Sequence, residues 1–408
     1  MRTNLEEHDP DRTHWAPYME WAQARPTARW DLAGSNLLHV EPCELLSAEP
    51  CELVRAEPCD LEGPAAALAL HGSSSGGHPP LLDAIAAHYG ATSDRVATAT
   101  GASGANFLAL AALLRPGDEV LFETPGYDPI LGAARLLGAG VRRFERRFEQ
   151  GWALDPERVE AALGPSTRVV AITNPHNPTG ARVTEGALAA LADLAERRDL
   201  WVLVDEVYLD SATFPGVFAE PAAARRLGEL TVAGRGGRFV ATSSLTKSYG
   251  LSGLRCGWAI AEPAVAAAMR RARGVVDAVA PMPTDALSVL AFAQLDRLAR
   301  RAAELLAPNL RLLERWIESS AALAWSPPAG GTVAFPRVAG VEDTAPLCRA
   351  LLDDAGIAVV PGALFGEPRH VRISFGGLRP DAFASALAEL GPRLTAAETA
   401  GRSAPVDP

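Results

Sequence analysis

The chain has 408 residues, of which 49 are acidic and 38 basic, so its formal net charge at pH 7 is −11. The summed field of this charge repels nucleic acids and anionic membrane surfaces, which excludes general binding to either. The length allows two domains of ordinary size with ample core.

We expect no secretory signal in the first residues. The opening stretch MRTNLEEHDPDRTHW is acidic and polar and lacks the apolar run of a secretory signal. No window approaches 18 uninterrupted apolar residues, so we predict no transmembrane helix and a cytoplasmic location. We expect free thiols, because no CxxC pair links any of the cysteines, which are Cys43, Cys51, Cys59, Cys256 and Cys348.

Residues 40–63 repeat an eight-residue unit three times, as VEPCELLS, AEPCELVR and AEPCDLEG. A cysteine every eight residues does not match known zinc-ligand spacings, and no nearby histidine completes a ligand set. We therefore predict no metal site. We interpret the stretch as a local tandem duplication in a connecting segment, too short to define a solenoid.

Short apolar runs alternate with helical patterns between about residues 65 and 290. Strands are predicted by β-rich runs at 95–100, 118–123, 168–173, 200–206 and 237–244. Helices are predicted at 103–114, 184–198 and 220–230. Strands that alternate with helices of this length indicate crossover connections, and therefore an α/β domain with a mostly parallel sheet sandwiched by helices.

The C-terminal third has a different pattern. A long helical stretch at 287–320 precedes β-rich runs at 330–338, 356–362 and 370–376, with helices predicted at 345–355 and 379–390. These elements predict a small α+β domain with a mixed sheet. We divide the chain into an N-terminal segment that contributes to the small domain and the substrate entrance (1–64), a large domain (65–295), a small C-terminal domain (296–395) and a disordered tail (396–408).

Polar or glycine-rich groups follow the predicted strands of the large domain. GASGAN follows residue 100, NPHNPTG follows residue 173, DEVY begins at residue 205, and LTK follows residue 244. Ligands of open α/β sheets bind outside the carboxyl ends of the strands, so we expect these four groups to converge on one site. The turn at Gly101, Ala102 and Ser103 would direct backbone N–H groups toward an anion such as phosphate. Each group taken singly has a structural explanation as well.

Lys247 is the only lysine in the chain, and every other basic side chain among the 38 is an arginine. A composition biased toward GC-rich codons explains the many arginines, but it does not explain why one lysine is kept. A guanidinium stays protonated, whereas a lysine amine in a partly desolvated, cation-rich site can lose its proton and attack a carbonyl carbon. The presence of one lysine among the arginines therefore predicts that the protein's chemistry requires Lys247 as a nucleophile.

The motifs together resemble the fold-type I pyridoxal-phosphate enzymes of the class I/II aminotransferase family. SSLTKSYGLSGLRCG lies downstream of NPHNPTG and DEVY, in the order that the family has, and the resemblance runs from WDLAGSNL to HVRISFGG. It implies pyridoxal 5'-phosphate (PLP) as cofactor, a fold-type I α/β architecture and a homodimer. It also implies transfer of an amino group between an amino acid and a 2-oxo acid, by a ping-pong mechanism through a Schiff base on Lys247.

The resemblance also implies roles for individual residues around the cofactor. Lys247 corresponds to the Schiff-base lysine and proton shuttle, Asp205 to the partner of the pyridinium nitrogen, and Tyr208 with Asn177 to the pair at the phenolic oxygen. Tyr127 corresponds to the ring stacked on the pyridine. The phosphate site corresponds to Gly101, Ala102, Ser103, Ser244 and Arg255.

The substrate carboxylate corresponds to a second set of residues. Arg372 in HVRISF matches the arginine that grips the α-carboxylate as a bidentate fork, and Gly34 and Asn177 lie near the same group. Two features depart from the family. His71 stands where many relatives have a tyrosine that reaches the partner subunit's phosphate, and the repeats at 40–63 fall in a segment that often lines the substrate entrance.

Two alternatives to amino transfer stay open. The same cofactor supports elimination, decarboxylation and ring formation, and the motifs are also similar to those of cyclising synthases, so a PLP-dependent lyase or cyclase is the second hypothesis. A non-catalytic PLP-binding regulator is the third. It predicts a basic winged-helix domain ahead of the cofactor domain, for which the residues before LAGSN are too few.

Overall fold

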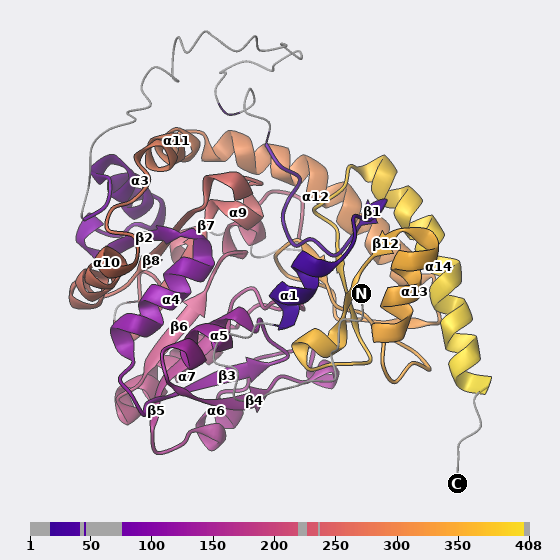
Figure 1. The fold of residues 1–408 in the computed structure, drawn as a ribbon, viewed down its shortest axis with the longest axis horizontal. Helices are drawn as coiled ribbons and strands as arrows, with labels where there is room; N and C mark the ends of the chain where they lie inside the picture. The colour runs from indigo at the N-terminus through magenta and orange to yellow at the C-terminus, as the bar shows by residue number, and fades with distance from the viewer. Residues whose placement is uncertain (1–16, 41–44, 46–75, 219–226, 236, 404–408) are drawn as a thin grey trace.

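The described residues form a large α/β part and a smaller C-terminal part that lie side by side (Figure 1). The structure is a computed structural model and describes residues 17–40, 45, 76–218, 227–235 and 237–403. Within these ranges no helix is both long and apolar enough to cross a membrane. The repeats at 40–63, apart from Val40 and Leu45, lie outside the described residues, as do His71 and the three cysteines of the repeats.

The large part is built on a seven-stranded sheet with the strand order β2-β8-β7-β6-β5-β3-β4. All neighbouring strands are parallel except at β8, which runs antiparallel to both β2 and β7. The strands are β2 (Val96–Thr100), β3 (Glu119–Thr124), β4 (Gly140–Glu145), β5 (Thr167–Thr173), β6 (Trp201–Asp205), β7 (Phe239–Ser244) and β8 (Cys256–Ile260). The prediction of a mostly parallel sheet is confirmed.

Two of these strands, β4 and β8, were not predicted from the sequence. β4 is an edge strand in which Phe144 alone is fully buried, so its residues lack the apolar run of a central strand. β8 follows directly on the SSLTKSYGLSGLR motif and has five buried residues. The connection through α9 reverses the direction of the chain, so β8 pairs antiparallel with β7.

Helices cover both faces of this sheet. In β5, alternate side chains pack into two different apolar clusters, one on each face. Val169 and Ala171 belong to one apolar cluster, while Val170 and Ile172 belong to the other. The first cluster includes residues of α4 (Gly101–Leu113), α5 (Pro129–Leu136) and α10 (Pro263–Val276). The second includes residues of α3 (Pro79–Tyr89), α6 (Pro156–Ala162), α7 (Glu185–Arg198), α8 (Leu227–Leu230) and α9 (Leu245–Ser248). Residues 219–226 lie outside the described residues, so of the helix predicted at 220–230 only α8 is seen.

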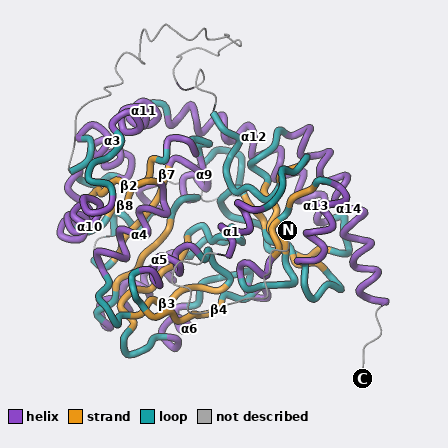
Figure 2. Tube along the Cα trace, viewed as in Figure 1, coloured by secondary structure: helices purple, strands orange, loops and turns teal. Residues whose placement is uncertain are grey.

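The long helical pattern at 287–320 belongs to two helices, α11 (Met282–Phe292) and α12 (Leu295–Glu318). The chain then forms α13 (Ala345–Ala355) and α14 (Pro380–Ser403), which cover the short strands of the C-terminal part (Figure 2). The strands are β9 (Leu323–Ala324), β10 (Val333–Ala334), β11 (Arg337–Val338), β12 (Ile357–Ala358), β13 (Val360–Pro361) and β14 (Val371–Ser374).

These strands form separate small sheets rather than the one mixed sheet that the sequence predicts. β14 pairs antiparallel with β10 and β13, and β9 pairs with β11. The N-terminal segment supplies α1 (Pro17–Ala24) and β1 (Trp30–Asp31), and β1 pairs in parallel with β12. The short strands leave too few ladder hydrogen bonds for one continuous sheet, and loops and side chains complete the packing.

The predicted disordered tail is partly wrong, because α14 continues to Ser403. The stretch TAAETA at residues 395–400 is rich in alanine, which has the highest helix propensity and extends the preceding helix. Residues 404–408 lie outside the described residues. The proposed division of the chain into domains stays a prediction.

Candidate active site

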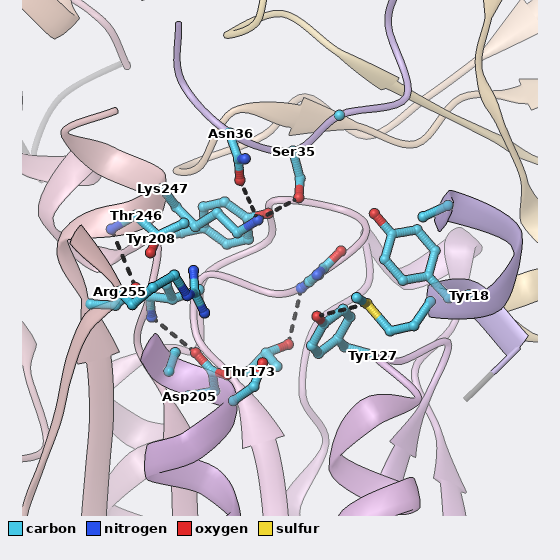
Figure 3. Close-up of a pocket in the computed structure, with 18 residues that line it drawn as sticks. Tyr18, Ser35, Asn36, Tyr127, Thr173, Asp205, Tyr208, Thr246, Lys247 and Arg255 are labelled. Carbon is cyan, nitrogen blue, oxygen red and sulfur yellow. Dashed lines mark hydrogen bonds between the residues drawn. The ribbon is translucent and has the colours of Figure 1, made fainter. Parts of the chain in front are cut away.

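A cavity of about 280 Å³ lies where the carboxyl ends of β5, β6 and β7 meet the start of α4. Thr173, Asp205 and Ser244 end the three strands and line the cavity, as expected for an open α/β sheet. α1 and residues 34–36 close it from the other side (Figure 3). The structure brings together most of the predicted site residues in its lining, namely Gly34, Ala102, Ser103, Tyr127, Asn177, Asp205, Tyr208, Ser244, Lys247 and Arg255.

Lys247 lies on α9, the single helical turn that follows β7. The turn is capped by Ser244, whose hydroxyl accepts a hydrogen bond from the backbone N–H of Thr246 at 3.3 Å. The Nζ of Lys247 donates to the Oγ of Ser35 at 2.8 Å and to the Oδ1 of Asn36 at 2.6 Å (Figure 3). The amine is therefore held inside the cavity rather than in solvent.

The environment of Lys247 favours the neutral amine. Burial lowers the pKa of Lys247 from 10.5 to about 7, and the nearby cations Arg372 and Arg255 act in the same direction, whereas Asp205 opposes them. At neutral pH a large fraction of this amine therefore carries a free electron pair, as a nucleophile or base requires.

We expect the labelling rate of Lys247 by an amine-specific acylating reagent, in protein freed of cofactor, to rise through a midpoint near pH 7. Only the neutral amine reacts, so an ordinary lysine would still gain reactivity above pH 10. Because the chain has one lysine, peptide mass mapping assigns a labelled side-chain amine to Lys247. A midpoint above pH 9 would contradict the prediction.

Asp205 is buried at the end of β6 and is held by a network that the sequence analysis missed. Its Oδ2 accepts a hydrogen bond from the Nδ2 of Asn106 at 2.7 Å, and its Oδ1 accepts from the backbone N–H of Val207 at 3.0 Å. The Oδ1 of Asn106 accepts from the Thr242 hydroxyl at 2.6 Å, which fixes the amide. Burial raises the pKa of Asp205, so its charged form calls for a cationic partner in the cavity.

Replacing Asn106 with alanine is expected to weaken cofactor binding roughly 10- to 100-fold, because a hydrogen bond to a charged group contributes about 1.5–3 kcal/mol. The measurement is a titration of cofactor-free protein followed by absorbance. Asn309→Ala is the matched control, since this buried asparagine bonds the carbonyl oxygens of Phe375 and Leu378 instead. Equal loss of affinity in both variants would show a general effect on folding.

The predicted phosphate end of the cavity depends on two glycines. Gly101 has a φ of +69°, and a Cβ at this position would collide with the guanidinium of Arg255. A Cβ on Gly257 would in turn collide with the backbone of Gly101. The backbone N–H of Gly101 donates to the carbonyl oxygen of Arg255 at 2.7 Å, so Gly101 itself serves the turn while Ala102 and Ser103 line the cavity.

The donors at this end suit a phosphate dianion. Ala102 and Ser103 stand in the first turn of α4, a 13-residue helix whose dipole favours an anion at its N-terminus. The hydroxyl of Thr246, which the sequence analysis did not select, is buried and has no hydrogen-bond partner among the described residues. With Ser244 and Arg255 these groups supply the backbone donors, hydroxyls and fixed cation that such a ligand requires.

Tyr208, Asn177 and Tyr127 surround the middle of the cavity. Within the described part of the chain the Tyr208 hydroxyl is buried without a partner, and burial raises its pKa to about 12. Asn177 donates through its backbone N–H to the Thr173 hydroxyl at 2.9 Å. The Tyr127 hydroxyl contacts the sulfur of Met19 at 3.7 Å. An orphaned phenol and a buried carboxyl facing one cavity fit an aromatic cofactor with polar substituents, as PLP is.

Arg372 is fully buried on β14 and lies behind the cavity wall rather than in it. Its Nη1 donates to the Oδ1 of Asn177 at 3.1 Å, and its Nη2 donates to the Tyr18 hydroxyl at 2.6 Å and to the Ala33 carbonyl oxygen at 3.0 Å. The guanidinium also lies 4.8 Å from the centre of the Tyr18 ring. Tyr18 therefore occupies one side of the predicted carboxylate fork.

Only weak sequence signals mark the site residues that were not predicted. Tyr18 belongs to the aromatic-rich stretch HWAPYMEWAQ, and Ser35 and Asn36 follow the selected Gly34 directly. Asn106 is a lone polar residue in the otherwise apolar stretch NFLALAALL. Each is a polar or aromatic side chain whose partner lies far away in the sequence. Cys256 and Cys348, the cysteines that the structure describes, are free and buried away from this cavity lining.

Comparisons with known proteins agree with this geometry. Residues 66–390 match the model of the family described as aminotransferase class I and II. A capreomycidine synthase from Streptomyces vinaceus is 32% identical over 287 residues, covering 70% of this chain and 71% of the relative. A probable N-succinyldiaminopimelate aminotransferase, DapC, from Mycobacterium tuberculosis is 32% identical over 301 residues, covering 72% and 74%.

A solved structure gives the same result for the fold. The crystal structure of the PLP-dependent cyclase OrfR superposes with a TM-score of 0.76 at 26% identity, covering 93% of this chain and 97% of that one. The fold is therefore that of fold-type I PLP enzymes, and the cofactor of the family fits the donors described above. This chain belongs to the class I and II aminotransferase family and is a PLP-dependent enzyme.

Proposed function

We propose that the enzyme transfers an amino group between an amino acid and a 2-oxo acid by a ping-pong mechanism. The observation that carries the proposal is the single lysine of the chain, placed inside the cavity as an amine with a pKa of about 7. A base with a pKa near the working pH is the most effective in proton transfer. The aminotransferase DapC among the relatives supports the same reaction type.

PLP, when bound, supplies an aldehyde that condenses with primary amines and a ring that withdraws electrons from the substrate's α-carbon. We assign its binding to Asp205 at the ring nitrogen, to Tyr208 and Asn177 at the phenolic oxygen, and to Tyr127 at the ring face. Ala102, Ser103, Ser244 and Arg255 are assigned to the phosphate.

The protein's own groups then perform two tasks. Arg372 orients the amino acid by its α-carboxylate, for which its Nε, buried and without a partner among the described residues, offers a further donor. Lys247 takes the α-proton at its Nζ and would return it to the cofactor carbon bonded to the substrate's nitrogen, and the same steps in reverse would serve the incoming 2-oxo acid. Asn106 and the backbone N–H of Val207 donate to the Asp205 carboxylate, and these hydrogen bonds favour its charged form against the effect of burial.

A lyase or cyclising synthase is the second candidate, and the identity to a capreomycidine synthase favours it specifically. The two functions differ in the fate of the amino group. Incubation of the enzyme with a panel of amino acids, each with an excess of a 2-oxo acid, separates them. Amino transfer yields a new amino acid and a new 2-oxo acid in equal amounts. Ammonia or a cyclic product without a new amino acid would overturn the proposal in favour of the second candidate.

We also propose that the enzyme is a homodimer, as the resemblance to the family implies. Val275, Val276 and Val279, at the end of α10 and just beyond it, are exposed apolar side chains, and a second copy would bury them. Light scattering coupled to size exclusion measures the mass directly, and a monomer at micromolar concentration would contradict the proposal.

A further inference from the structure

Residues 30–40, which we call the N-terminal strap, cross the cavity as an extended segment between the two parts of the molecule. The strap is tied to the C-terminal part by backbone hydrogen bonds. The N–H of Leu32 donates to the Ala358 carbonyl at 2.9 Å, and its own carbonyl accepts from the N–H of Ser374 at 2.7 Å. Further along, the N–H of Leu38 donates to the Gly376 carbonyl at 2.7 Å. The backbone of the strap is thus fixed on both sides of residues 35 and 36.

The strap is also locked to the segment that carries Lys247. The N–H of Val40 donates to the carbonyl of Gly250 at 3.2 Å. Gly250 has a φ of +73°, and a Cβ there would lie 2.5 Å from the Leu38 carbonyl oxygen, so only glycine allows this approach. The glycine of the KSYG motif therefore brings the strap within reach of Lys247.

Ser35 and Asn36 point from the strap into the cavity and contact the Lys247 amine (Figure 3). Ser35 is 7% exposed, and its carbonyl accepts a hydrogen bond from the Thr332 hydroxyl at 2.8 Å, which fixes its backbone. Asn36 is exposed, and its Oδ1 faces the amine. No other hydrogen bond of the Nζ is formed with the residues that the structure describes.

The charges that face the Nζ explain why such partners are needed. Arg372 from β14 and Arg255 beyond β7 repel a protonated amine, and Asp205 at the end of β6 attracts it only in part. A flexible lysine side chain would leave this cation-rich position unless it were held. The Ser35 hydroxyl suits a group that changes protonation, because it accepts from an ammonium and donates to a neutral amine.

We propose that Ser35 and Asn36 are positioning residues that receive the Lys247 amine whenever it is not covalently engaged, and hold it where it exchanges protons with the substrate's α-carbon. This inference rests on the proposed function, in which the Nζ of Lys247 takes up and returns one proton. The pair adds no atom to the reaction. It restricts the amine to one position and favours its protonated state through two accepted hydrogen bonds.

The first test uses protein freed of PLP and the amine-labelling titration of Lys247, so it needs no turnover. In Ser35→Ala/Asn36→Ala the midpoint is expected to fall by about one to two pH units, since each hydrogen bond to the ammonium favours the charged form. Ser248→Ala is the matched control. Its hydroxyl, on the same helix as Lys247, contacts the Val207 carbonyl at 3.4 Å and should leave the midpoint unchanged.

The second readout uses the enzyme loaded with PLP. The primary isotope effect of an α-deuterated amino acid is expected to rise in the double variant, with kcat falling about 10- to 100-fold and KM changing little, because proton transfer alone is slowed. Ser35→Thr keeps the hydroxyl and should restore most of the rate. If the double variant does not fold, Asn36→Ala alone, at an exposed residue, should give a smaller shift of the same sign.

An unchanged midpoint in the double variant, or an equal fall in Ser248→Ala, would overturn the inference. Failure of the proposed function gives a different result. An enzyme that releases ammonia or a cyclic product instead of transferring the amino group would still show the shifted midpoint, because the titration reports only the contacts of the amine.

Discussion

Replacing Lys247 with arginine is expected to lower turnover by about 10⁴-fold or more, although the positive charge is kept. A guanidinium stays protonated at any pH the protein survives, so it neither attacks an aldehyde nor accepts the α-proton. The wild-type amine, with a pKa of about 7, does both near neutral pH. The measurement is the rate of 2-oxo acid release from a reactive amino acid, under saturating PLP.

The single lysine gives this experiment an unusually clean control. Borohydride reduction should attach the cofactor mass to one lysine-containing peptide in the wild type and to none in Lys247→Arg. In Lys247→Ala, which opens space beside Ser35 and Asn36, added ethylamine should restore part of the rate. Transfer at the wild-type rate by Lys247→Arg would refute the role of the amine as nucleophile and base.

Replacing Arg372 with lysine is expected to raise the KM for amino acids by roughly 10- to 100-fold, with a smaller change in kcat. The guanidinium contacts Asn177, Tyr18 and Ala33 through its two Nη atoms and keeps its planar fork in place. An ammonium supplies neither the planar fork nor the second parallel donor. The loss of one hydrogen bond between charged groups, about 1.5–3 kcal/mol, corresponds to this range.

Arg337→Lys is the matched control for Arg372→Lys. Arg337 also stacks on an aromatic ring, 4.4 Å from the centre of Phe148. Its partners Phe148 and Glu149 lie outside the cavity lining, whereas Arg372 contacts Asn177 and Tyr18, which line the cavity. Replacement of Arg337 should leave KM unchanged. An equal rise in both variants, or no rise in Arg372→Lys, would show that the carboxylate is bound elsewhere. With a substrate analogue that lacks the carboxylate, the wild type and Arg372→Lys should have similar KM values.

The strand ends were predictable because they depend on local patterns. A buried β-rich run followed by a polar residue predicts both the strand and its exposed end, so the positions of Asp205 and Ser244 follow from the sequence. Two strands were not predicted: β4, whose edge position leaves its residues exposed, and β8, whose direction depends on the connection through α9. The end of α14 was predicted too early, since helix propensity carries the helix to Ser403.

The partners of the site residues were not predictable in the same way. Asn106 meets Asp205 across 99 positions of the sequence, and Ser35 meets Lys247 across 212. Tyr18 reaches Arg372 from 354 positions away. No periodicity connects such residues, because the contacts arise only when the strap and α1 fold over the cavity between the two parts of the chain.

The sequence by itself determined the α/β class, the chemistry of a lone lysine and the set of groups at the strand ends, because each depends on residue type and local order. Only the tertiary structure decided the pKa of Lys247, the burial of Arg372 behind Tyr18 and the contact of Ser35 and Asn36 with the amine. Desolvation and charge–charge interactions act through space. They are set by which distant segments pack together, and that packing is what the linear order of residues leaves open.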